Sequence, residues 1–184
     1  MFQKVFIANR GEIAVRVIRS CKEMGIQTVA IYSEADRTAP HVLKADEAYC
    51  VGPPPSTESY LNEEAIFKVL EKSKADAVHP GYGFLSENAE FAKAIQNRGI
   101  TWIGPSAKVI TTMGDKMAAR NLAIESDVPV VPGTTEPVKD ISDAKKTAHS
   151  MEYPVLIKAA GGGGGKGMRI IHSETELENS MERA

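Results

Sequence analysis

The 184-residue sequence has little of what marks several classes of protein. Its two cysteines, Cys21 and Cys50, stand alone and so predict neither a disulfide framework nor a CxxC zinc site. The four histidines are too scattered for a metal motif. No stretch is apolar for long enough to span a bilayer, and the first strand-like run, at Val5, leaves no room for a targeting peptide. We therefore expect a protein of a reducing compartment without a membrane partner: a cytoplasmic protein of a bacterium, or a matured organellar protein.

Charge of one sign and aromatic residues are also scarce. There are 22 basic and 24 acidic residues, a formal net charge of −2, and aromatic residues make up 6%. No basic stripe with interleaved aromatics occurs, so the sequence predicts no nucleic-acid partner. The length suits one domain, or one domain and part of a second.

Strand-like and helix-like stretches alternate over residues 1–113. Val5–Ala8 predicts a first strand, and the helical pattern that follows it ends at Gly25. Asn62 and Ser86 are suited to cap two later helices. Further strands are predicted at Thr28–Tyr32, Ala48–Val51, Ala75–His79 and Thr101–Ile103. This alternation predicts an α/β fold with a doubly wound, Rossmann-like parallel sheet.

The pattern changes over residues 114–184. After helices at Asp115–Ser126 and near Ser142–Ser150, two strands are predicted at Tyr153–Ala159 and Met168–His172. A capping box of Ser173 and Glu176 then begins a last helix. Because a two-stranded sheet is marginal alone, we expect this part to be a second domain that is cut short.

Five successive glycines, Gly161–Gly165, join these two strands. Composition alone would suggest a flexible linker. However, apolar strands flank the run, and pure glycine is costly in backbone entropy, which favours the close approach of a ligand. Successive N–H groups can hold an anion, while Lys158 and Lys166 add positive charge. Strand alternation also places Leu156 and Lys158 on one face, where an apolar side chain and a cation suit a base and its phosphates. We therefore predict that the glycine run is a loop that covers the phosphates of ATP.

Two familiar glycine motifs do not match. A P-loop requires GxxxxGK[ST] between a strand and a helix, whereas here Gly167 and Met168 follow Lys166, and a strand comes next. The turn after the first strand reads Asn9-Arg10-Gly11-Glu12 rather than GxGxxG, which argues against NAD.

Five strings of residues occur in the order seen in biotin carboxylases, and the sequence resembles that family over essentially its whole length. They are Val5–Ala14, His79–Asn88, Ile103–Pro105, Met113–Lys116 and Ile157–Gly167. The resemblance implies a Rossmann-like N-terminal domain over residues 1–113, followed by a truncated ATP-grasp domain over residues 114–184.

The resemblance also implies the chemistry of an ATP-dependent ligase. Such an enzyme uses Mg-ATP to activate bicarbonate as carboxyphosphate, and the carboxyl group passes to biotin on a carrier protein. Carboxylases of acetyl-CoA (in fatty acid biosynthesis), propionyl-CoA, methylcrotonyl-CoA and pyruvate all use this component, and the sequence does not say which it serves. In the family, the magnesium ligands, the second lobe that encloses the base, and the basic residues for bicarbonate and biotin lie beyond Ala184. We therefore expect no catalytic or metal-binding residue in this chain, and no activity of this chain alone.

Six residues carry the nucleotide site that the resemblance implies. Lysines would contact the nucleotide, two glycines would lie over its phosphates through backbone N–H groups, and two apolar side chains would flank the adenine. These are Lys116 and Lys158, Gly164 and Gly165, and Leu156 and Met168, respectively. Without the resemblance, Lys116 would be an ordinary helix-start residue, and the two apolar residues would belong to the core. We also expect the glycine loop to be poorly ordered without nucleotide.

Arg19 and Glu23 match positions at the homodimer contact of the family, although at i, i+4 they could equally be a surface pair. The turn His79–Gly83 follows a predicted strand; because His79 has no partner nearby in sequence, we interpret the turn as structural, facing the active-site side.

Two other functions stay open. One is another ATP-grasp ligase, of the carbamoyl-phosphate synthetase or purine-pathway carboxylase type. The other is a non-catalytic nucleotide-binding or dimerisation module.

Overall fold

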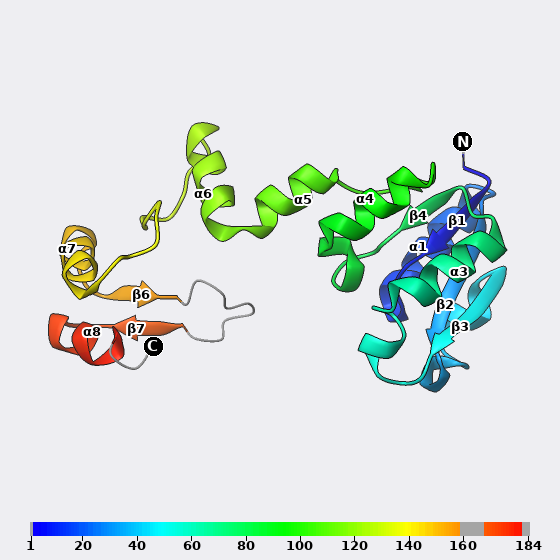
Figure 1. The fold of residues 1–184 in the computed structure, drawn as a ribbon, viewed down its shortest axis with the longest axis horizontal. Helices are drawn as coiled ribbons and strands as arrows, with labels where there is room; N and C mark the ends of the chain where they lie inside the picture. Colours follow the sequence, from blue (N-terminus) through cyan, green and yellow to red (C-terminus); the bar gives the residue numbers. More distant parts are fainter. Residues whose placement is uncertain (1, 159–167, 182–184) are drawn as a thin grey trace. The chain divides into compact units, whose positions relative to one another are not determined.

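The computed structural model describes residues 2–158 and 168–181 (Figure 1). The chain forms two compact units, Met1–Gly114 and Asp115–Ala184, which we call the sheet unit and the hairpin unit.

The sheet unit is built on a five-stranded parallel sheet with the strand order β3-β2-β1-β4-β5. The strands are β1 (Lys4–Ile7), β2 (Gln27–Ser33), β3 (Glu47–Gly52), β4 (Ala77–His79) and β5 (Thr101–Trp102). The helices are α1 (Gly11–Glu23), α2 (Pro40–Lys44), α3 (Glu63–Ser73), α4 (Ala89–Asn97) and α5 (Ala107–Gly114). The predicted α/β fold with a parallel, doubly wound sheet is confirmed. Its strand order changes direction between β1 and β4, which lie side by side in the sheet.

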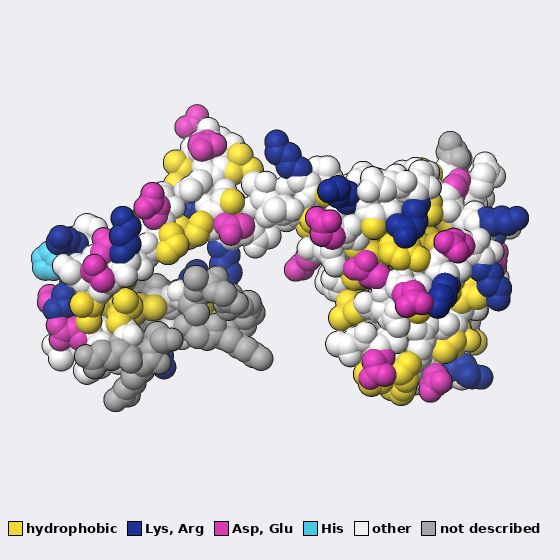
Figure 2. Space-filling view, viewed as in Figure 1, with side chains coloured by type: hydrophobic (Ala, Val, Ile, Leu, Met, Phe, Trp, Pro, Cys, Tyr) yellow, Lys and Arg dark blue, Asp and Glu magenta, His cyan; other side chains and the backbone are white. Residues whose placement is uncertain are grey.

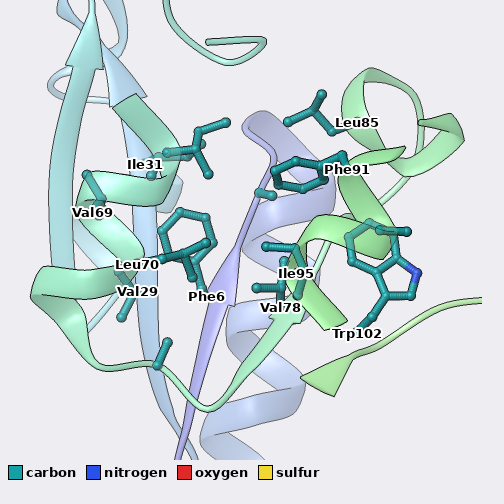
Figure 3. Packing of buried hydrophobic residues seen from close by; sticks show 14 of the residues in the cluster. Phe6, Val29, Ile31, Val69, Leu70, Val78, Leu85, Phe91, Ile95 and Trp102 are labelled. Atoms are coloured by element: carbon teal, nitrogen blue, oxygen red, sulfur yellow. The ribbon is translucent and has the colours of Figure 1, made fainter. Parts of the chain in front are cut away.

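Both faces of this sheet are buried, because successive residues of a strand point to opposite sides. Val5 and Ile7 of β1 pack with the apolar side of α1. Phe6 belongs to the other cluster, and Figure 3 shows it between side chains of β2 and α3 on one side and of β4 and α4 on the other. The ring of Phe91 meets that of Trp102 edge-on, with 5.9 Å between centroids.

The predicted helix caps are partly confirmed. The Asn62 side chain accepts a hydrogen bond from Ala65 N at 3.1 Å and caps α3, as predicted. The prediction for Ser86 is wrong, because its hydroxyl donates to Gly83 O at 2.7 Å inside the 3-10 turn Phe84–Glu87. Helix α4 begins later, and Asn88 caps it by accepting from Phe91 N at 2.9 Å.

The hairpin unit contains α6 (Lys116–Glu125), α7 (Ile141–Met151), β6 (Val155–Ile157), β7 (Arg169–Ile171) and α8 (Glu174–Met181). The two predicted strands pair antiparallel. A small core forms where α7 and α8 cover one face of this hairpin; its buried members are Ala144, Ala148, Ile171 and Leu177. Lys145 of α7 bridges to Glu174 at 3.1 Å and to Glu178, which ties the two helices together.

Acidic and basic side chains are interspersed on the face of the molecule shown in Figure 2. No helix within residues 2–158 and 168–181 is long and apolar enough to cross a membrane. Cys21 is buried and Cys50 is exposed, and both are free thiols.

Candidate functional site

The β6–β7 hairpin has one buried face and one open face. Val155, Ile157 and Ile171 pack toward α7 and α8. On the other face, Leu156 lies opposite Ile170 in the register, and their exposed fractions are 48% and 60%. Two large aliphatic side chains thus face outward from a sheet that is too small to bury them.

This open face continues beyond the paired residues. Lys158 and Met168 occupy the next positions of the register, two residues from Leu156 and Ile170, so alternation gives all four the same face. Met168 is 47% exposed. The structure therefore brings three of the six predicted site residues together, as an apolar surface with a lysine at one end. A flat, apolar group bearing negative charge, such as a nucleotide, matches that surface.

Lys116 lies on a different element, at the first position of α6. Asp115 caps this helix, and its carboxylate accepts from Ala118 N at 2.7 Å. A lysine in the first turn adds positive charge at the end of the helix that is already positive, which disfavours the helix but favours an anion nearby. The predicted roles of Gly164 and Gly165, and the expected poor order of Gly161–Gly165, concern positions outside the described residues.

A second candidate surface lies in the sheet unit, where β1 and β4 end. A pocket of about 450 Å³ opens there, lined by Asn9–Ile13 and Tyr82–Phe84. In open α/β sheets, ligands bind at the carboxyl ends of the strands where the strand order changes direction, and this pocket occupies that place.

The turn after β4 differs from its prediction in one respect. His79 does have a partner close in sequence, because its Nδ1 accepts a hydrogen bond from Gly81 N at 3.0 Å. Burial, followed by the charge of Arg16, lowers the pKa of His79. Both effects favour the neutral ring, which can accept this bond. The prediction that His79 has no partner nearby in sequence is wrong, because a tight turn folds the Gly81 amide back onto the imidazole.

Arg10 connects this pocket to a buried polar cluster. Its guanidinium lies 3.3 Å from Asp36 Oδ2 and 5.5 Å from the centre of the Tyr60 ring. The Tyr60 hydroxyl donates to the same carboxylate oxygen at 2.5 Å and accepts from Ser33 N at 2.9 Å. Burial of Tyr60 and its bond to Asp36 raise its pKa to about 12. Burial alone would raise the pKa of Asp36, but the bond from Tyr60 and the charge of Arg10 outweigh it and lower that pKa.

The sequence indicates the Asn9–Glu12 turn but no role for Arg10. The position of that turn at the end of the first strand was the only available signal. Asp36 and Tyr60 are distant from it in sequence, and only the fold brings them to Arg10.

Arg19 and Glu23 pair with each other along α1, with Nε and Oε1 3.0 Å apart and both side chains mostly exposed. In the described ranges, no group of three or more His, Cys, Asp or Glu side chains could hold a metal ion.

Comparison with known proteins identifies the family. Residues 1–110 match the model of the biotin carboxylase N-terminal domain. This chain belongs to the biotin carboxylase family. Residues 115–184 match the ATP-binding domain model of the carbamoyl-phosphate synthase L chain, which bears the name of one of the alternatives considered above.

Several biotin carboxylases and related subunits are similar along nearly the whole chain. The biotin carboxylase of Haemophilus influenzae is 56% identical over 182 residues, which cover 98% of this chain and 41% of that protein. The mitochondrial propionyl-CoA carboxylase alpha chain of Homo sapiens is 53% identical over 180 residues, covering 98% of this chain and 25% of that one. The chain thus spans about 40% of the length of the curated biotin carboxylases that it matches.

Solved structures of this family show the same fold. The biotin carboxylase domain dimer of Hydrogenobacter thermophilus 2-oxoglutarate carboxylase, solved with MgADP, ADP and bicarbonate, is 52% identical with a TM-score of 0.89. The biotin carboxylase of Campylobacter jejuni, solved as a β-γ-ATP complex, is 44% identical with a TM-score of 0.92. Each comparison covers 100% of this chain and about 40% of the other.

Proposed function

We propose that this chain is the N-terminal part of a biotin carboxylase, an ATP-dependent ligase that uses bicarbonate to carboxylate biotin on a carrier protein. Residues 1–113 would be its Rossmann-like domain, and residues 114–184 the first part of its ATP-grasp domain. Family membership and the nucleotide and bicarbonate bound by the Hydrogenobacter thermophilus relative support this function.

The open face of the hairpin carries the proposal within this chain. Leu156 and Met168 remain half exposed beside Lys158, although the opposite face of the same hairpin is buried. We propose that these two apolar side chains flank the adenine and that Lys158 and Lys116 contact the nucleotide. Backbone N–H groups of Gly164 and Gly165 would then lie over the phosphates.

The work of these residues is orientation and charge neutralisation. A lysine at the end of an apolar wall aligns the phosphates while the base is held by contact, and positive charge stabilises the transferring phosphoryl group. ATP supplies the activated phosphoryl group for bicarbonate. The magnesium ligands, and the basic residues that bind bicarbonate and biotin, would belong to the part of the enzyme outside this chain.

Further details of the assembly are proposals as well. Arg19 and Glu23, exposed on α1, would contribute to a homodimer contact. The free thiols of Cys21 and Cys50 suit the cytoplasm, where acetyl-CoA carboxylation in fatty acid biosynthesis is one process that such a protein could serve.

A grafted protein tests the function. Residues 1–184 are joined to the part of the Haemophilus influenzae biotin carboxylase that follows its matched 182 residues. We expect ATP hydrolysis that depends on bicarbonate and free biotin, and its loss in Lys116→Ala and Lys158→Ala. Lys68→Ala, at an exposed surface pair, is the matched control and should retain activity.

A folded grafted protein that binds ATP without bicarbonate-dependent turnover would contradict the proposal and favour a non-catalytic nucleotide-binding or dimerisation module. The 184-residue chain alone should show no turnover, and robust turnover by it would contradict the expectation that it is inactive on its own.

A further inference from the structure

One buried side chain joins the two loops that form the pocket of the sheet unit. Asn9 follows β1 and is 3% exposed. Its Nδ2 donates one hydrogen bond to Pro80 O and one to Tyr82 O, both at 2.8 Å. Its Oδ1 accepts from Arg10 N at 2.8 Å. A single amide thus connects the ends of two strands that are far apart in sequence but adjacent in the sheet.

The turn that Asn9 holds has an unusual backbone. Gly81, Gly83 and Phe84 all have positive φ, of 68°, 63° and 44°. Phe84 is a bulky residue in a region that side chains of its kind rarely occupy, so surrounding contacts must hold it there. A Cβ on Gly81 would lie 2.8 Å from Asn9 Nδ2, which shows how closely the amide fits beneath the turn.

Tyr82 is the residue that this turn presents outward. Its side chain is 61% exposed, and its hydroxyl donates to the carboxylate of Glu12 in the first turn of α1. Both residues line the pocket at the carboxyl ends of β1 and β4. Because Asn9 binds the carbonyl of Tyr82 itself, the amide fixes the backbone from which the ring projects.

We infer that Asn9 is a positioning residue for the reaction proposed above, on which this inference rests. Asn9 acts through the turn that it holds, because its buried amide fixes the backbone of Tyr82, whose hydroxyl bonds to Glu12 at the pocket where a ligand of the sheet unit would lie. If Asn9 served only to stabilise the fold, any folded variant would keep Tyr82 beside Glu12.

Two substitutions disrupt the hydrogen bonds from Asn9 to Pro80 O and Tyr82 O by different means. Asn9→Asp keeps the shape but replaces both donors with a carboxylate oxygen that faces two carbonyl oxygens. Gly81→Ala keeps Asn9 but adds a Cβ in the space of its amide. Asn62→Ala is the control, because it also removes a hydrogen-bonding asparagine of the sheet unit, one that only caps α3.

In the grafted protein, Asn9→Asp and Gly81→Ala should lower kcat for bicarbonate-dependent ATP hydrolysis by about 100-fold, the scale of a small misplacement at a reacting site. The KM for ATP should stay within about twofold, because the nucleotide residues lie in the other unit. Asn62→Ala should lower the unfolding temperature and leave kcat and the KM for ATP unchanged.

A second measurement uses the 184-residue chain. NMR should show a nuclear Overhauser contact between the Tyr82 ring and the Glu12 side chain, lost in Asn9→Asp and Gly81→Ala and kept in Asn62→Ala. A folded Asn9→Asp that keeps this contact, or in which the KM for ATP rises as much as kcat falls, would overturn the inference.

If Asn9→Asp does not fold, Asn9→Ala carries the same test without the added charge. An inactive unsubstituted grafted protein would count against the proposed function, whereas the NMR comparison decides the role of Asn9 by itself.

Discussion

The two units of this chain bury their sheets in opposite ways. The sheet unit covers both faces of five strands with helices, and residues such as Phe6 and Val78 are fully buried. The hairpin unit covers one face of two strands and leaves Leu156, Met168 and Ile170 outward. A large sheet that buries both faces is stable by itself, whereas a two-stranded one depends on what else it meets.

This difference assigns different tasks to the units. The sheet unit is packed on both faces and has a pocket where β1 and β4 end. The hairpin unit has an apolar face with a lysine beside it, and this is the face that we propose a nucleotide covers. The predictions below test this contrast, beginning with the largest effect.

Removal of the Phe6 ring from the core of the sheet unit should have the largest effect on stability. Phe6→Ala should lower the free energy of unfolding by about 3–5 kcal/mol, because it leaves a cavity in a fully packed core. Trp102 is the only tryptophan and lies in the sheet unit, so its fluorescence in urea reports this transition. Ile170→Ala, at a 60% exposed position of the hairpin unit, should change the free energy of the same transition by less than about 0.5 kcal/mol. Equal effects of the two substitutions would contradict the difference between a packed core at Phe6 and an open face at Ile170.

Truncation in the smaller core should have a smaller effect confined to its own unit. Leu177→Ala should cost the hairpin unit about 2–3 kcal/mol, the low end for such a change, because few neighbours surround the cavity. Amide hydrogen exchange should then speed up in α7 and α8 but not in the sheet unit. Faster exchange throughout β1 and β4 would show that the units do not fold separately.

Acid should weaken the sheet unit before its carboxylates are protonated. Burial lowers the pKa of His41, whose Nε2 lies 3.2 Å from Ile31 O. A base with a lowered folded pKa binds protons more readily when unfolded, so stability is lost as pH falls below about 6.5. The urea concentration at the midpoint of unfolding, followed by Trp102 fluorescence, should therefore be lower at about pH 5.5 than at about pH 7.5.

His41→Asn should reduce this pH dependence by removing the titrating group, while the dependence from His79 persists. An unchanged midpoint across this range in the unsubstituted chain would contradict the buried, neutral state of His41.

The periodic parts of the fold could be predicted from the sequence. Apolar runs such as Val5–Ala8 predict buried parallel strands, and the glycine run between two strands predicts the hairpin. The helix after β4 was predicted too early, because both Ser86 and Asn88 are good caps and only the turn at Phe84–Glu87 decides between them.

Which side chains share a surface could be predicted only where they are close in sequence. Leu156 and Lys158 share a face because strands alternate, which the sequence shows directly. The links from Asn9 to Tyr82 and from Arg10 to Asp36 and Tyr60 depend on strand order and on loops that meet across the sheet. Nothing in the spacing of these residues indicates that they meet.

Methyl NMR of the 184-residue chain during titration with ATP tests the central claim most directly. We predict that the methyl resonances of Leu156, Met168 and Ile170 shift together with added nucleotide, while methyl groups of the sheet unit, such as those of Val5 and Ile66, do not. Shifts confined to the sheet unit, or no shifts at the solubility limit of ATP, would contradict the assignment of the open hairpin face to the nucleotide.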